Sequence, residues 1–215
     1  MFCRLSLCAL LLIPAVPTAA AATATDIVDA NKSGQADWDR GDPITAMPKL
    51  KIAADGGNAE AQALLGYILD EADNDVEAAD YYRKAAEQGN ADGLYGLAMF
   101  HHSGDGDVKK DMPTARALFF KAAEAGHQQA LSAVVSSYIN GGLGLTDEER
   151  ASSEALKWIQ KGAAAGTIAA MERIVKAHRK GEFGLPVNPE EADRLQAKIY
   201  EIQGIDPSKR KRRRH

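Results

Sequence analysis

Cysteine is almost absent from this chain of 215 residues, and its only two copies lie at positions 3 and 8. Disulfide scaffolds and thiolate metal sites need cysteines spread through the fold, so both are excluded for the rest of the chain, as is a cysteine nucleophile. Aromatic residues are also few, at 6% of the chain, whereas alanine runs are frequent. This balance favours helices packed through small side chains over a β-sandwich or barrel, whose strands are rich in aromatic and β-branched residues.

Long apolar runs are confined to the start of the chain, which excludes a polytopic membrane protein. There, Arg4 is followed by the apolar stretch Leu5–Val16 and then by two small-x-small patterns, Ala20–Ala22 and Ala22–Ala24. This order of features is typical of a secretory signal peptide and its cleavage site. We therefore expect residues 1–24 to direct export, and the mature protein to be periplasmic or secreted in a bacterium.

There are two alternatives to a cleaved signal. The apolar stretch is shorter than the ~20 residues that a membrane-spanning helix needs, which disfavours a membrane anchor. A lipoprotein signal would place a small residue before the lipidated cysteine, but Leu7 precedes Cys8. The signal peptide is therefore the favoured interpretation, and it would leave a mature chain without cysteine.

Four glycines, at spacings of 32, 37 and 40 residues, mark an internal repeat. The residue eleven positions before each glycine is alanine, and the residues four before, three before and four after it are alanine or glycine. This register places small residues on helix faces where two backbones approach closely, and the glycine itself fits the C′ position after a helix. The glycines are Gly57, Gly89, Gly126 and Gly166, and the alanines are Ala46, Ala78, Ala115 and Ala155.

The same register predicts where the second helix of each pair begins. Asp and Asn side chains four residues before the alanine can accept hydrogen bonds from the free N–H groups of the first turn. A following proline fits the first helical position, and a glutamate three residues later predicts a capping box. In the fourth unit Ala151 replaces the cap, and we expect Ser152 or Ser153 to take its role. The N-caps are Asp42, Asn74, Asp111 and Asn188, the prolines Pro43 and Pro189, and the glutamates Glu77 and Glu191.

The predicted fold is all-α, with about five antiparallel helix pairs stacked into a right-handed superhelix, because one pair cannot bury its apolar stripe alone. The first helices of the pairs are expected at 27–40, 58–71, 90–103, 127–140 and 167–180. The second helices are expected at 43–55, 75–88, 112–125, 152–165 and 189–202. A repeat domain over 25–203 would then be followed by a basic tail over 204–215 that does not fold.

The segments Tyr81–Ala91, Leu118–Gly126 and Leu65–Gly66 resemble the core of a Sel1-like repeat, which is similar to a tetratricopeptide repeat. The resemblance covers about residues 40–203. The chain departs from the motif at Ala72, where a loop glycine is usual, and at His101 and His178, where an aromatic residue is usual. The first pair, 27–55, is the weakest match and is expected to act as a cap.

The sequence motifs of catalysis are absent, since the chain has no HExxH, GxSxG, CxxC or phosphate-binding glycine loop. His101 and His102 point in different directions on a helix, so they cannot chelate one metal ion together. The Gly104–Asp107 segment is too short for a calcium loop and fits a plain turn. We therefore expect no catalytic site, metal or cofactor. The resemblance leaves an enzyme acting on cell-wall material as an alternative, because cysteine-rich relatives are described as β-lactamase-like.

A binding surface is expected on the first helices, which line the concave face in related helical repeats. The repeat motif leaves some positions on these helices unfixed. Along the chain these positions are first acidic, with two tyrosines and a methionine, then polar and finally basic. This order predicts a groove that binds a protein or peptide segment. Packing between helices explains the tyrosines equally well, and a solvated face is the simpler explanation of the charges. The candidates are Glu60, Tyr67, Asp70, Glu71, Asp92, Tyr95, Met99, His102, Gln129, Ser132, Ser136, Asn140, Glu172, Lys176, Arg179 and Lys180.

Aromatic residues on the second helices are expected to serve a structural role. Tyr81, Tyr82, Phe119 and Trp158 occupy motif positions and are predicted to pack in the core between neighbouring pairs. Phe120 falls where the other units have polar residues, so we expect it on the exposed convex side.

The end of the chain carries a block of positive charge. All 30 acidic residues lie between Asp26 and Asp206, whereas six of the 26 basic residues follow one another as Lys209, Arg210, Lys211, Arg212, Arg213 and Arg214. Such a block often binds polyanions such as nucleic acid or anionic lipid headgroups, and a solvated tail is the alternative. Together with the resemblance, these features predict an exported scaffold or adaptor for a protein or peptide partner, with polyanion binding as a further option.

Overall fold

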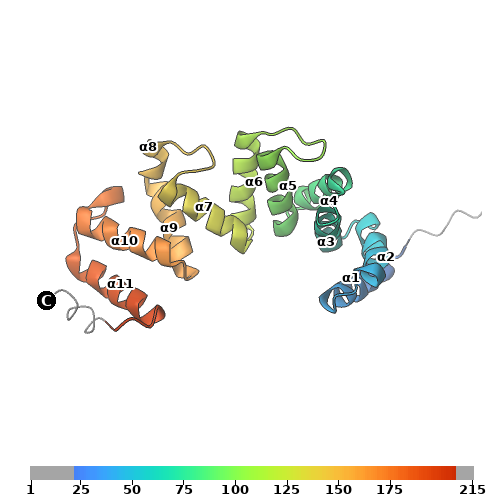
Figure 1. Ribbon diagram of the computed structural model, residues 1–215, viewed down its shortest axis with the longest axis horizontal. Helices are drawn as coiled ribbons and strands as arrows, with labels where there is room; N and C mark the ends of the chain where they lie inside the picture. Colours follow the sequence, from blue (N-terminus) through green and yellow to red (C-terminus); the bar gives the residue numbers. More distant parts are fainter. Residues whose placement is uncertain (1–21, 207–215) are drawn as a thin grey trace, which may run out of the picture.

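The computed structural model describes residues 22–206, and within this range all regular structure is helical, as predicted. The first 21 residues, which hold most of the predicted signal peptide, and the basic run Lys209–Arg214 lie outside it. Figure 1 shows helix pairs that follow one another along an arch, with α1 and α2 at one end and α10 and α11 at the other. The part of the chain that the structure describes contains no helix long and apolar enough to span a membrane.

Ten of the helices match the predicted five pairs to within a few residues at each end. They are α1 (Ala24–Asp39), α2 (Pro43–Asp55), α3 (Ala59–Asp70), α4 (Asp75–Glu87), α5 (Ala91–Ser103), α6 (Met112–Glu124), α7 (Gln128–Asn140), α9 (Ser153–Ala164), α10 (Ile168–Lys180) and α11 (Pro189–Ile202). Two short elements were not predicted, namely α8 (Asp147–Arg150) and the 3-10 helix η1 (Glu182–Gly184). Each second helix packs against its own first helix and against the first helix of the next pair, which makes the array a solenoid.

Small residues lie at the contacts between the helices. The four alanines eleven residues before the marker glycines are completely buried. A Cβ atom added to Gly93 on α5 would lie only 2.4 Å from the Cβ atom of Ala85 on α4, so these two helices meet at a distance that glycine alone permits. The recurring alanine and glycine positions therefore set the spacing of successive helices.

The marker glycines end the second helices as predicted. Each follows the last helical turn and has a positive φ angle, which glycine adopts without a Cβ clash. The φ angles are 90° at Gly57, 77° at Gly89, 97° at Gly126 and 89° at Gly166.

The predicted helix caps form at four of five sites. The side chains of Asp42, Asp111, Asn188 and Ser152 each accept a hydrogen bond from a backbone N–H of the first turn. Asn74 is the N-cap residue of α4 as predicted, but its side chain accepts no hydrogen bond from the backbone, and its amide donates one to the Glu77 carboxylate at 3.0 Å. The capping boxes predicted at Glu77 and Glu191 are also not formed. The two boxes found in the described residues are Thr23 with Asp26 and Thr146 with Glu149.

The predicted core aromatics are buried, with 2% to 4% of their surface exposed at Tyr81, Tyr82, Phe119 and Trp158. Phe120 differs from the prediction, because it is only partly exposed and its ring contacts the edges of Tyr138 and Trp158 at centroid distances of 5.9 and 5.2 Å.

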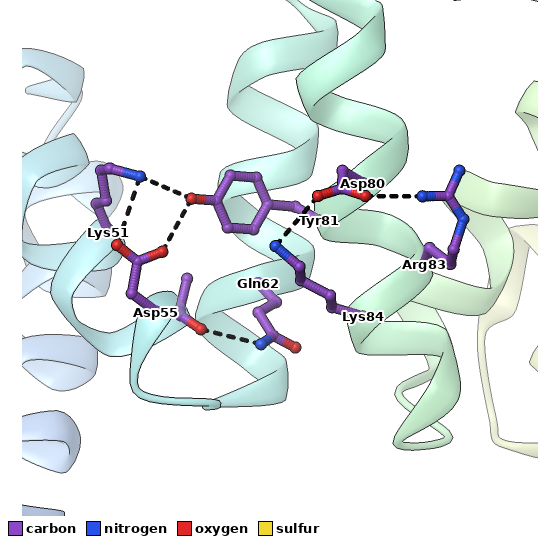
Figure 2. A network of polar contacts seen from close by, with 8 residues as sticks. Lys51, Asp55, Gln62, Asp80, Tyr81, Arg83 and Lys84 are labelled. Atoms are coloured by element: carbon purple, nitrogen blue, oxygen red, sulfur yellow. Dashed lines mark hydrogen bonds and ion pairs between the residues drawn. The ribbon is translucent and has the colours of Figure 1, made fainter. Parts of the chain in front are cut away.

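The hydroxyl of Tyr81 joins two repeat units. It accepts a hydrogen bond from Lys51 at 2.9 Å and donates one to Asp55 at 3.1 Å, and both partners lie on α2 (Figure 2). The ammonium group of Lys51 also lies 3.4 Å from the carboxylate of Asp55 and 5.6 Å from the centre of the Tyr81 ring. A lysine is therefore held between a carboxylate and a tyrosine at this junction.

Candidate binding surface

A hollow of about 670 Å³ lies between α3, α5 and the start of α7, with contributions from α1 and α4. We call it the acidic hollow, because three of its lining residues are carboxylates and none is lysine or arginine. Its volume falls in the range of sites that take a small molecule or a few peptide side chains. It is lined by Gln35, Glu60, Ala63, Leu64, Tyr67, Asp70, Tyr82, Asn90, Asp92, Tyr95, Gly96, Met99, His127 and Gln129.

Helix periodicity explains why these side chains meet. Residues three, four or seven apart lie on one face of a helix. On α3 this face presents Glu60, Tyr67 and Asp70, and on α5 it presents Asp92, Tyr95 and Met99. Because α3 and α5 are the first helices of neighbouring pairs and contact each other, the two faces form one surface.

The floor of the hollow is the buried ring of Tyr82 from α4. A Cβ atom added to Gly96 would lie 2.4 Å from this ring, and one added to Gly66 would lie 2.9 Å from it. The two glycines thus let the ring approach α3 and α5 closely. Burial, and then the nearby charge of Asp70, raise the pKa of Tyr82, so its hydroxyl stays protonated and able to donate a hydrogen bond.

Two of the walls present exposed apolar surface. Tyr67 is 44% exposed and contacts the ring of Trp38 edge-on at a centroid distance of 6.0 Å. Met99 is 41% exposed. Tyr95, on the same helix as Met99, is partly buried, and its ring stacks on the imidazole of His127 at 4.1 Å. Tyrosine and methionine are side-chain types enriched in the cores of interfaces.

Among the described residues, no lysine or arginine lines the hollow beside its carboxylates. Glu60 accepts a hydrogen bond from the amide of Asn31 at 3.1 Å. A carboxylate oxygen of Asp92 lies 3.4 Å from Nε2 of His127. Asp70 is partly buried, and its pKa is raised by that burial and then by the nearby negative charges of Asp75, Glu71 and Asp105. The site therefore has an excess of negative charge that it does not neutralise with a lysine or arginine of its own lining.

His127 is the N-cap of α7, because its Nδ1 atom accepts a hydrogen bond from the backbone N–H of Ala130 at 3.1 Å. Only an unprotonated Nδ1 can accept this bond. Burial lowers the pKa of His127, and the negative charge of Asp92 partly opposes that shift. The neutral imidazole is thus the form that caps the helix and stacks on Tyr95.

The structure gathers only part of the predicted binding surface. Seven of the predicted residues line the acidic hollow, namely Glu60, Tyr67, Asp70, Asp92, Tyr95, Met99 and Gln129. Among the others, His102 packs edge-on against Phe119 at 6.4 Å, and Asn140 donates a hydrogen bond to Ser136 at 3.4 Å.

The basic end of the predicted groove lies elsewhere. Glu172, Lys176 and Arg179 line a separate shallow hollow with Gln196 of α11, and Arg179 pairs with Asp193 at 3.2 Å. The acidic and the basic residues of the predicted groove thus line two different hollows in the described residues.

Several lining residues were missed by the sequence reasoning. Tyr82 was assigned only to the core, although a buried ring can also form the floor of a hollow. Gln35 belongs to the first pair, which has the weakest repeat pattern. His127 had a usable signal, because it directly follows a marker glycine where two other units have the N-caps Asn58 and Asn90.

Comparisons with known proteins agree with this architecture. The Sel1 repeat model matches residues 59–90, 91–127 and 139–167. The chain is similar to a protective antigen present in uropathogenic Escherichia coli strains that displays an SLR fold, with 29% sequence identity, a TM-score of 0.62 and 81% of this chain covered. This chain spans 38% of the length of that protein. It is also similar to a Sel1 repeat protein from Oxalobacter formigenes, with 24% identity, a TM-score of 0.57, and 80% of this chain and 70% of that chain covered.

The cap at His127 predicts a pH-dependent stability. The pKa of His127 is lower in the folded protein than in the unfolded chain, where it is 6.5. The stabilisation that the neutral imidazole gives the fold is therefore complete above pH 6.5 and is lost as the pH falls through the pKa of the folded protein. His127→Asn keeps a capping acceptor that does not titrate. We expect wild type to lose roughly 1 kcal/mol more unfolding free energy than this variant between pH 7.5 and pH 5, as measured by urea denaturation.

The matched control for this measurement is His102→Asn, because His102 is exposed and caps no helix. That variant should keep the pH dependence of wild type. An identical pH dependence in wild type and His127→Asn would show that the cap does not titrate as described.

Proposed function

We propose that this chain, which is similar to Sel1 repeat proteins over residues 59–90, 91–127 and 139–167, is a scaffold that seats a protein or peptide segment in the acidic hollow. The single observation that carries the proposal is the convergence of side chains from five helices on one hollow with exposed tyrosine and methionine surface. Tyrosine, amide and carboxylate groups in a preformed concave site are suited to non-covalent recognition. Polyanion binding by Lys209–Arg214 stays a prediction, because these residues lie outside the described range.

A position-specific cross-linking experiment tests this proposal. A photoreactive benzoylphenylalanine is placed at Tyr67, inside the hollow, or at Val76 of α4, which is 58% exposed but does not line it. We expect irradiation in envelope extract to join a discrete protein to the Tyr67 variant and not to the Val76 variant. Equal cross-linking from both positions, or none from Tyr67, would contradict binding at the hollow.

We also propose that the chain is exported and cleaved after Ala22 rather than after Ala24. The sequence offers both sites, and the support for the first is the capping box of α1. The hydroxyl oxygen of Thr23 accepts a hydrogen bond from the backbone N–H of Asp26 at 3.2 Å, and the backbone N–H of Thr23 donates to the Asp26 carboxylate at 2.9 Å. Cleavage after Ala24 would remove this N-cap, and losing an N-cap costs about 1 kcal/mol.

The expected mature protein therefore begins at Thr23. Intact-mass and N-terminal peptide analysis of the periplasmic and culture fractions of a bacterium expressing the full chain measures this directly. Thr25 as the first residue would contradict the proposed cleavage site, and an uncleaved chain confined to the cytoplasm would contradict export.

A further inference from the structure

We propose that the segment seated in the acidic hollow belongs to a partner protein and carries a lysine or arginine side chain, held between a tyrosine ring and a carboxylate. This inference rests on the proposed function and names the chemistry of its partner. The first support is charge, because the lining contains Glu60, Asp70 and Asp92 but no lysine or arginine. A basic segment complements that field, whereas an acidic segment is repelled by it.

The second support is the spacing of tyrosine and carboxylate on the two helices. Tyr67 and Asp70 are three residues apart on α3, and Asp92 and Tyr95 are three residues apart on α5. Residues three apart on a helix are neighbours on its surface, so each tyrosine of the wall lies beside a carboxylate. The Tyr67–Asp70 pair offers a cation an aromatic ring and a negative charge at the same place, whereas at the second pair His127 already stacks on one face of Tyr95 and lies 3.4 Å from Asp92.

The third support is that the chain already holds a lysine in this way. Lys51 lies 3.4 Å from the carboxylate of Asp55 and 5.6 Å from the Tyr81 ring centre, and it donates a hydrogen bond to the Tyr81 hydroxyl (Figure 2). The acidic hollow repeats this combination of residue types at Tyr67 and Tyr95, and in the described residues no lysine or arginine of the chain lines it.

Other aromatic rings of the described chain are also covered by cations from within the chain. Lys161 lies 4.2 Å from the ring centre of Trp158, and the guanidinium carbon of Arg173 lies 4.3 Å from that of Phe183. Tyr67, although 44% exposed and next to a carboxylate, has no such cation among the described residues. A cationic side chain supplied from outside the chain would make the same kind of contact with the exposed ring of Tyr67.

Selection of a random dodecapeptide library on the full chain tests the inference. We expect the enriched peptides to share at least one fixed lysine or arginine position, with an apolar residue nearby. Their binding, measured by fluorescence anisotropy, should weaken about tenfold or more in the double variant Asp70→Asn with Asp92→Asn, as expected for a lost charge-assisted contact. Replacing the fixed basic residue of the peptide by glutamine should have a similar effect.

The matched control is the double variant Glu148→Gln with Glu190→Gln, which makes the same change in net charge at exposed positions outside the hollow. It should leave the affinity within about twofold, because separated surface charges are screened. An equal loss in both double variants would show that net charge, and not the hollow, attracts the peptide, and would overturn the inference.

Three further outcomes separate this inference from the proposed function. If the enriched peptides contain no basic residue but bind the Tyr67→Ala variant more weakly than wild type, the inference of a cationic partner is overturned and the proposed scaffold function stands. Failure to enrich any peptide dependent on Tyr67 would count against both. If a synthetic peptide of residues 207–215 competed as well as the enriched peptides, the occupant would be the basic tail of this chain and not a partner protein.

Discussion

Helices α4 and α5 approach so closely at Gly93 that a methyl group there would lie 2.4 Å from the Cβ atom of Ala85. Protein interiors are packed to a density that leaves no slack for such a group, so the contact needs glycine on one side and alanine on the other. The same register recurs along the chain, with completely buried alanines at Ala46, Ala78 and Ala115. Small residues at this register let each pair pack against the next one.

The acidic hollow is a direct consequence of this close packing of helices. Gly66 on α3 and Gly96 on α5 make room for the ring of Tyr82, which lines the hollow together with Gly96. Tyr67 and Tyr95 also line the hollow, on helices whose relative position is set by the packed repeat. The hollow therefore follows from how the helix pairs pack against one another.

The sequence was sufficient for the helices because their signals are local. A positive φ angle at Gly89, or a cap at Asp111, depends on a few neighbouring residues, and the register of alanine and glycine repeats those signals. Asn74 shows the limit of the N-cap rule. Its side chain donates a hydrogen bond to Glu77 and does not accept one from the backbone. The short helix α8 was missed because Thr146 and Glu149 form their capping box within an inter-helix loop, outside the repeat register.

The shape of the binding surface was less predictable for a different reason. Whether Glu60 and Arg179 belong to one groove depends on how each pair is rotated relative to the next, and that rotation is decided by side-chain packing between pairs. The periodic pattern placed Tyr67 and Tyr95 on one surface, and both line the acidic hollow. It carried no information on the break between the acidic hollow and the basic end, nor on the stacking of His127 against Tyr95.

Urea denaturation of Gly93→Ala compared with Gly162→Ala tests the close-packing claim most directly. Both substitutions place a methyl group in a helix and should gain up to about 1 kcal/mol of helix propensity. At Gly93 the methyl would lie 2.4 Å from the Cβ atom of Ala85 and 2.9 Å from the backbone of α4, whereas at Gly162 the nearest atom is a side-chain atom of Val135 at 2.8 Å and no backbone atom is among the three nearest. The account predicts that Gly93→Ala lowers the unfolding free energy by about 1–3 kcal/mol and that Gly162→Ala lowers it less. Unchanged or increased stability in Gly93→Ala would contradict it.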